Sequence, residues 1–351
     1  MSFPACVFNL KQSLSDTSPK TLQMENRPMN PEKFSTCKLL VVGDLMIDEY
    51  VWGDVDRISP EAPVPVVSVT REDYTLGGSG NVVNNLAALG AHIRVAGVTG
   101  TGSGGTLMVQ RFASMGVDAG GVVQDPRRPT TRKTRILGGS QQVLRIDRET
   151  RRDIAGETRE SIATYIQSAI PTVDAVLISD YGKGLLTPDL LARIIQQARQ
   201  HDKPAIVDPK GLDFEKYHNA FLITPNKKEA GLAAGIEIVD QDTLDRAAQT
   251  IFKKTGAQNL LITCGQDGMA LYEGNVEPYI IHSRARQVFD VSGAGDTVVA
   301  VTGLALSAGR TLRDAAALAN LAAGIVVGKI GTATVTLQEL SAVAETEANT
   351  I

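Results

Sequence analysis

The sequence predicts an α/β protein with a doubly wound, mostly parallel sheet and a small β-sheet lid that protrudes from it. From residue 150 onward, short apolar segments alternate with helical segments, as in a parallel sheet covered by helices on both faces. Polar residues with glycine or proline follow the apolar segments, and the strand ends of such a sheet share one edge. Two other β-like segments, 51–70 and 130–147, contain prolines or paired glycines and fit a separate small sheet.

The composition is that of an ordinary globular protein. The 351 residues are 43% hydrophobic and 21% charged, and the net charge of −4 argues against binding to nucleic acid. No apolar run approaches the roughly 18 residues of a membrane span, and no secretory signal is present, so we expect a cytoplasmic protein without membrane contact. The cysteines and histidines lack the spacing of a metal or redox site; they are Cys6, Cys37, Cys264, His92, His201, His218 and His282.

We expect one large domain from residue 36 to residue 340. Residues 1–35 are polar and mixed in composition, which is typical of a flexible tail, and residues 341–351 are expected to form a C-terminal tail. The lid is expected to come from residues 49–75 and 120–147 of the domain.

The first predicted strand is Lys38–Gly43, and two carboxylates follow it. Asp44 and Asp48 are candidates for ligand contacts at the sheet edge, or they are simple turn and cap residues. A glycine-rich stretch, Gly77–Asn81, then leads into a helix over 82–89. Asn81 offers a donor and an acceptor to a sugar hydroxyl, and its alternative role is that of a helix cap.

After a strand over 92–98, Gly100–Gly105 matches the dinucleotide pattern G-x-G-x-x-G. That pattern requires an acidic residue about 20 residues later, at the end of the next strand. Asp118 lies in range, but its glycine-rich surroundings indicate a turn. The pattern therefore supports an NAD-dependent oxidoreductase only weakly.

The later strands end in residues that could hold a phosphorylated ligand. Asn226 and Glu229 have helical i, i+3 spacing and could position Mg²⁺ through water, or they could cap a helix. Lys183 and Lys210 could each bind an anion, or they could be solvated loop lysines. The strand ends after residue 150 contribute Asp180, Lys183, Asp208, Lys210, Asn226, Glu229, Thr263 and Gly265.

The stretch Asp290–Asp296 is a glycine-rich turn that runs into an apolar helix. The backbone N–H groups of Gly293, Ala294 and Gly295 would form an anion hole at the helix N-terminus. Asp296 beside that anion would be the base that takes a proton from an attacking hydroxyl. A tight turn with Asp296 as a cap would give the same local sequence.

Gly77–Asn81 and Asp290–Asp296 resemble the two signatures of the ribokinase-like (PfkB) carbohydrate kinases, and the resemblance covers about residues 38–340. It implies transfer of the γ-phosphate of ATP to a sugar hydroxyl, with Asp296 as base, and a kinase domain over residues 36–340. It also implies Mg²⁺ and leaves a monovalent cation as a further candidate. The implied sugar contacts are Asp48, Gly78 and Asn81, the magnesium and phosphate motif is Asn226 and Glu229, and the nucleotide contacts are Thr263, Gly265, Gly268 and Asn320.

Within the family, four stretches resemble the members that phosphorylate D-glycero-β-D-manno-heptose 7-phosphate at O1 in lipopolysaccharide core synthesis. They are 57–66, 179–184, 208–211 and 326–332. An H-x-G-H nucleotidyl motif is absent, so we expect the kinase activity alone. The candidate clamps for the substrate phosphate are Arg57, Arg145, Lys183 and Lys210; Asp44, Gly77 and Asp208 complete the candidate substrate contacts.

Two stretches depart from the family pattern. Ser79-Gly80 stands where members often have Ala-Ala or Ala-Gly, and Gly102-Ser103-Gly104 stands where many members carry an aspartate. By analogy with the family, the lid is expected to pair two copies into a homodimer. The same residues would also fit a kinase for another sugar or a sugar-binding regulator without activity, and the retained Asp296 argues against the regulator.

Overall fold

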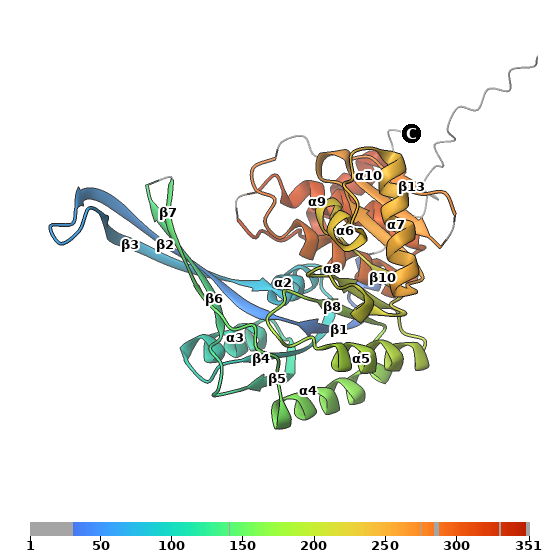
Figure 1. The fold of residues 1–351 in the computed structure, drawn as a ribbon, viewed down its shortest axis with the longest axis horizontal. Coiled ribbons are helices and arrows are strands. Elements are labelled where there is room, and N and C mark those ends of the chain that lie inside the picture. Colours follow the sequence, from blue (N-terminus) through green and yellow to red (C-terminus); the bar gives the residue numbers. More distant parts are fainter. Residues whose placement is uncertain (1–30, 140, 275, 284–287, 330, 349–351) are drawn as a thin grey trace, which may run out of the picture.

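The computed structural model describes residues 31–139, 141–274, 276–283, 288–329 and 331–348. The chain forms one large sheet covered by helices on both faces, and a second, smaller sheet that projects from it (Figure 1). The predicted fold class is confirmed. Among the described residues, no helix is long and apolar enough to cross a membrane.

The large sheet has nine strands in the order β13-β12-β11-β10-β9-β8-β1-β4-β5. The parallel strands are β1 (Lys38–Gly43), β4 (His92–Thr99), β5 (Asp118–Gln124), β8 (Ala175–Ser179), β9 (Ala205–Asp208), β10 (Leu222–Ile223) and β11 (Asn259–Thr263). Antiparallel strands β12 (Met269–Glu273) and β13 (Tyr279–Ile281) extend one edge. The direction of winding reverses between β1 and β8, and the ends of those two strands are where such a sheet binds ligands.

Two helical layers cover the sheet because its strands are apolar on both faces. In β1, Leu39 and Val41 belong to one core, and Leu40 and Val42 belong to the other. The first core packs against α1 (Pro31–Phe34), α2 (Ser79–Ala88), α3 (Ser103–Ser114), α8 (Ala294–Ser307), α9 (Leu312–Val326) and α10 (Leu337–Ala348). The second packs against α4 (Gly156–Ala169), α5 (Pro188–Gln200), α6 (Lys227–Ala234) and α7 (Gln241–Thr255). Short 3₁₀ turns lie at Ile170–Thr172, Glu215–Tyr217 and Gly265–Asp267.

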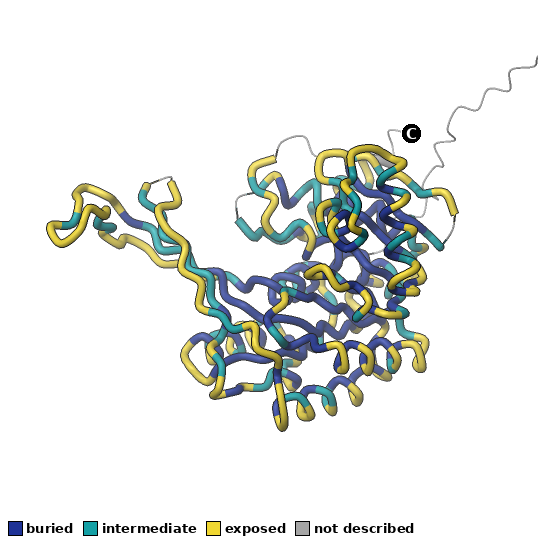
Figure 2. Tube along the Cα trace, viewed as in Figure 1, coloured by how far each residue is buried: buried dark blue, intermediate teal, exposed yellow. Residues whose placement is uncertain are grey.

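The small sheet has the order β3-β2-β6-β7, with β2 (Leu45–Ile58), β3 (Pro65–Gly78), β6 (Thr131–Gly138) and β7 (Gln141–Arg148). We call these four strands the lid. Its base is buried in the body, whereas its far end is exposed on both sides (Figure 2). Pro65 is the first residue of β3, a position where the lack of an N–H costs no hydrogen bond inside the strand.

Three segments differ from the predicted domain boundaries. Residues 120–124, expected in the lid, belong to β5, where Val122 and Val123 pack against the two cores of the large sheet. Pro31–Phe34 forms a short helix because the Phe34 ring is buried in the first core. Residues 341–348 continue α10, which the buried Leu340 fixes to the body. The remaining tail residues, 1–30 and 349–351, lie outside the described residues.

Candidate active site

Asp296 lies in the first turn of α8, at the edge of the large sheet. Gly293 precedes this helix with φ 80°, and no side chain of the described residues caps it. Glycine is required at 293 for a second reason, because a Cβ there would lie 2.5 Å from Asn81 Nδ2. The helix is apolar beyond its first turn, so the Asp296 side chain is only 3% exposed.

Two donors bind the Asp296 carboxylate, one on each oxygen. Asn81 Nδ2 donates to Oδ2 at 2.9 Å, and the Tyr181 hydroxyl donates to Oδ1 at 2.9 Å. Burial raises the pKa of Asp296 to about 6, the two hydrogen bonds lower it, Asp48 raises it and Lys133 lowers it. With this pKa, the Asp296 carboxyl group is mostly ionised at neutral pH and can accept a proton there.

The backbone of Gly293, Ala294 and Gly295 forms the turn into α8 that the sequence predicted as an anion hole. A Cβ at Gly295 would meet no atom within 4 Å, so the space beside this turn is open. The first N–H groups of a helix have no partner within the helix, and the helix dipole favours an anion beside them. The arrangement is suited to binding a phosphoryl group next to a carboxylate base.

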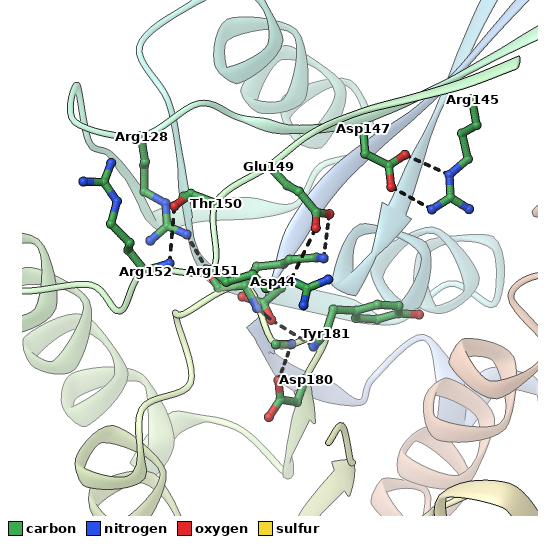
Figure 3. A network of polar contacts seen from close by, with 12 residues as sticks. Asp44, Arg128, Arg145, Asp147, Glu149, Thr150, Arg151, Arg152, Asp180 and Tyr181 are labelled. Carbon is green, nitrogen blue, oxygen red and sulfur yellow. Dashed lines mark hydrogen bonds and ion pairs between the residues drawn. The ribbon is translucent and has the colours of Figure 1, made fainter. Parts of the chain in front are cut away.

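Asp44 connects the ends of β1 and β8. Its Oδ2 accepts the backbone N–H of Tyr181 at 2.9 Å and that of Lys183 at 3.1 Å (Figure 3). The side chain is 2% exposed, and burial raises its pKa. Its Oδ1 has no hydrogen-bond partner among the described residues. Asp44 thus fixes the loop that carries Tyr181, and its second oxygen is buried without a partner among the described residues.

The base of the lid brings the first glycine signature to the site. Asp48 on β2 is buried and accepts a hydrogen bond from Arg135 on β6. A Cβ at Gly77 would lie 2.1 Å from Asp48 Oδ2, and Gly78 has φ 56°, so both positions require glycine. The Asp48 carboxylate is close enough to Asp296 to raise its pKa, whereas the hydrogen bond from Asn81 lowers it.

A group of cations lies on the lid side of this site. Lys183 is paired with Glu149 at 2.6 Å, and Arg145 is paired with Asp147 at 2.7 Å (Figure 3). The ammonium group of Lys133 on β6 makes no hydrogen bond or ion pair with any residue that the structure describes; its Nζ lies 5.7 Å from the centroid of the Tyr181 ring. Burial lowers the pKa of Lys133, Asp48 raises it, and repulsion from Lys183, Arg145 and Arg135 lowers it further.

The carboxylates on the other side of Asp296 belong to β9 and α6. Asp208 is partly buried, and burial together with the charges of Asp296 and Glu229 raises its pKa well above its usual value. Asn226 and Glu229 form a capping box at the start of α6, so the capping role that the sequence left open for them is present. Glu229 also accepts a hydrogen bond from Lys210 Nζ at 2.7 Å.

The predicted nucleotide contacts gather near the end of β11. Thr263 pairs with Asn226 through an isolated β-bridge. Gly265 and Gly268 have φ 63° and 99°, and a Cβ at Gly268 would lie 2.0 Å from the Ile281 carbonyl oxygen. Asn320 donates to the His282 carbonyl oxygen at 2.9 Å, so its amide also orders the segment after β13.

The structure does not bring every predicted residue to the site. Arg57 is exposed near the far end of β2, away from the Asp48 end of the strand that meets the body. It therefore does not join Asp296 within the same chain.

The Gly100–Gly105 loop has a packing role that the sequence pattern did not reveal. A Cβ at Gly105 would lie 2.1 Å from the Gly100 carbonyl oxygen, and one at Gly100 would lie 2.6 Å from that of Arg128. Asp118, predicted in a turn, is the first residue of β5. A dinucleotide site would require the acidic residue at the end of that strand. Asp125 follows β5, but Arg127 and Thr158 already bind its carboxylate. These contacts argue against a dinucleotide site.

The sequence did not single out Tyr181 or Glu149 as site residues, and it offered Lys133 only as one of five lid cations that could face inward, with Arg57, Arg132, Arg135 and Arg145. Tyr181 directly follows Asp180 at a strand end, which was the available signal. Lys133 becomes a neighbour of Asp48 only through the parallel pairing of β2 with β6.

Comparisons with known proteins agree with this fold. The model of the pfkB family carbohydrate kinase matches residues 37–339. The bifunctional protein HldE of Desulfatibacillum aliphaticivorans is 55% identical over 309 residues, which are 88% of this chain and 63% of the relative. That of Trichlorobacter lovleyi is 49% identical over 316 residues, 90% of this chain and 64% of the relative. The chain therefore spans less than two thirds of the length of these relatives.

Solved structures show the same fold at low identity. Arabidopsis thaliana ribokinase complexed with ribose and ATP has a TM-score of 0.69 at 19% identity, over 87% of this chain and 97% of that chain. Escherichia coli phosphofructokinase-2 in complex with potassium has a TM-score of 0.72 at 17% identity, over 88% of this chain and 98% of that chain.

We predict that Asp296→Asn stabilises the protein in a pH-dependent way. The pKa of Asp296 rises from 3.8 to about 6 on folding, so the stability contributed by its protonated form is present below pH 4 and lost as the pH rises through 6. The substitution should therefore add up to about 3 kcal/mol to the free energy of unfolding at pH 8, and much less at pH 4.5. Urea unfolding at both pH values measures this difference, and an equal effect at the two would contradict it.

Proposed function

The chain belongs to the pfkB family of carbohydrate kinases, and on that premise we propose that it transfers the γ-phosphate of ATP to O1 of D-glycero-β-D-manno-heptose 7-phosphate. The product would be the 1,7-bisphosphate, a precursor in ADP-heptose and lipopolysaccharide core synthesis. One observation carries the kinase chemistry: the buried Asp296 carboxylate stands beside the open N-terminal turn of α8. The sugar is supported by the four stretches that resemble heptose 7-phosphate kinases.

In this reaction, Asp296 accepts the proton of the anomeric hydroxyl as O1 bonds to the γ-phosphorus. The bond between that phosphorus and the β,γ-bridging oxygen breaks, and ADP leaves. The N–H groups of Gly293 and Gly295 would face the charge of the transferred group, whereas the Ala294 N–H donates to the Val291 carbonyl oxygen at 3.3 Å. Phosphoryl transfer depends mainly on alignment and charge neutralisation, which these fixed groups provide.

The cations on the lid side support a phosphorylated sugar as substrate. Lys133 has no anionic partner within hydrogen-bond distance among the described residues, and it is partly buried next to Lys183 and Arg145. A buried cation without a partner is unfavourable, and a substrate phosphate would supply the missing anion. We assign the 7-phosphate to Lys133 and Lys183, with Arg145 at the outer side. Arg57 of the same chain lies too far along β2 to take part.

The nucleotide side is suited to Mg²⁺ carried by ATP. Among the described residues, no three His, Cys, Asp or Glu side chains form a group that could hold a metal alone. Burial and the charges of Asp296 and Glu229 raise the pKa of Asp208, and a divalent cation near Asn226 and Glu229 would offset this repulsion. Mg²⁺ keeps most of its waters and phosphate ligands, so it needs few protein ligands. When bound, it neutralises charge on the transferred group. A monovalent cation rests on the family resemblance alone.

The lid also supports a homodimer. The lid exposes Ile58, Val69, Leu144 and Ile146, and every residue of the edge strand β7 is exposed. Exposed apolar edge strands pair with other strands unless something covers them. A second copy of the lid is the occupant we propose.

The enzyme should release ADP with heptose 7-phosphate far faster than with unphosphorylated heptose, ribose or the fructose phosphates. Asp296→Asn should lower turnover by roughly a hundredfold to ten-thousandfold while the binding of both substrates is kept, because a general base is lost. If the enzyme prefers another sugar, it is still a carbohydrate kinase, but the assignment of heptose 7-phosphate as substrate is wrong. Near-normal turnover in the variant would remove Asp296 from the mechanism.

Lys133→Met should raise KM for heptose 7-phosphate by about tenfold or more and leave KM for ATP unchanged, because a charge-assisted phosphate contact is lost. The exposed Lys253→Met on α7 is the matched control. If the variant raises KM for unphosphorylated heptose by the same factor, Lys133 does not bind the phosphate.

Leu144→Glu should convert the dimer to a monomer in sedimentation equilibrium, because it places a charge in the apolar lid surface. Leu232→Glu, on the equally exposed surface of α6, should leave the dimer intact. A wild-type protein that sediments as a monomer would contradict the proposal.

A further inference from the structure

The loop after β8 connects three parts of the site. It runs through Asp180, Tyr181, Gly182 and Lys183, and Asp44 fixes its backbone through two N–H groups. Asp180 Oδ1 accepts the Gly182 N–H at 2.7 Å, which turns the loop back on itself. The backbone of Tyr181 is therefore held from β1, and its side chain reaches Asp296 on α8.

We propose that Tyr181 is a positioning residue for Asp296. Its hydroxyl binds Oδ1 while Asn81 binds Oδ2, so the carboxylate plane is fixed and the remaining lone pairs point to one place. The terminal torsion of an aspartate is otherwise soft, and a freely turning carboxylate would meet the sugar hydroxyl less often in the right orientation. This inference rests on the proposed function, because it assigns Tyr181 a task in that reaction.

The tyrosine can act only as a donor in this place. Burial raises its pKa well above the usual value, and the nearby carboxylates of Asp296, Asp208 and Asp48 raise it further. The phenol therefore stays protonated at any pH at which the protein is folded and active. Its proton is directed at Oδ1, so the hydroxyl itself does not accept the proton of the substrate.

Each neighbour of Asp296 contributes to its titration. Asp48 on β2 and Asp208 at the end of β9 oppose its ionisation, whereas Lys133 on β6, Asn81 on α2 and Tyr181 favour it. A donor to a carboxylate stabilises the ionised form. Removing the Tyr181 hydroxyl must therefore raise the pKa of Asp296 and leave less of the base ionised near pH 6.

Tyr181→Phe isolates this effect because it keeps the ring beneath Lys133 and removes only the hydroxyl. We expect the acidic limb of kcat/KM for the sugar phosphate to move up by about one pH unit. The loss of kcat should be largest near pH 6 and fall to less than about tenfold at pH 9, with KM for ATP unchanged. A residue that only supported the fold would lower activity equally at all pH values.

Tyr217→Phe is the matched control. The Tyr217 hydroxyl also lies in the interior and donates to a carboxylate at the same sheet edge, Asp180 Oδ2, at 2.7 Å. It has no contact with Asp296. This variant should leave the acidic limb in place, and an equal shift in both variants would overturn the proposal.

The pKa of Asp296 can also be measured without substrate, by carbon-13 NMR of aspartate-labelled protein with Asp296→Asn for assignment. An increase in Tyr181→Phe supports the proposal, and an unchanged pKa overturns it whatever happens to turnover. If the wild-type protein phosphorylates no sugar, the proposed function fails. The NMR titration then still decides whether Tyr181 holds the carboxylate.

Discussion

The site depends on one constraint: the carboxylate of Asp296 is buried in the protein. A charge without donors in such a place costs several kcal/mol. Asn81 and Tyr181 provide those donors, one for each oxygen of Asp296. They come from the glycine-rich entry to α2 and from the loop after β8, so the two hydrogen bonds that stabilise the ionised carboxylate also join three distant segments.

The close approach of these segments explains the glycines better than turn formation alone. Gly293 leaves room for the Asn81 amide, and Gly77 leaves room for the Asp48 carboxylate. At either position, a Cβ atom would overlap with the polar side chain that now lies beside the glycine. The reversal of winding between β1 and β8 then lets Asp44 connect the two strand ends.

The charges are arranged around this carboxylate in two groups. On the lid side, Lys183 and Arg145 are neutralised by Glu149 and Asp147. The pair of Arg145 and Asp147 lies within β7, whereas the pair of Lys183 and Glu149 ties the loop after β8 to the segment that follows the lid. On the nucleotide side, the acids Asp208 and Glu229 outnumber Lys210, which leaves room for a metal cation.

The sequence by itself determined the parallel sheet, the lid and the edge where the site lies. Strand and helix periodicities are local, and polar residues after apolar segments mark the strand ends. The glycine-rich stretches around Asn81 and Asp296 were also visible in the sequence, although the contacts that require Gly77 and Gly293 come from distant segments. Only the tertiary structure decided which side chains meet. Lys133 reaches the site through the pairing of β2 with β6, and Tyr181 reaches Asp296 through a loop held by Asp44. Arg57, predicted as a clamp, lies near the far end of β2. The order of residues does not fix distances between segments, because those follow from sheet register and from the packing of the two cores.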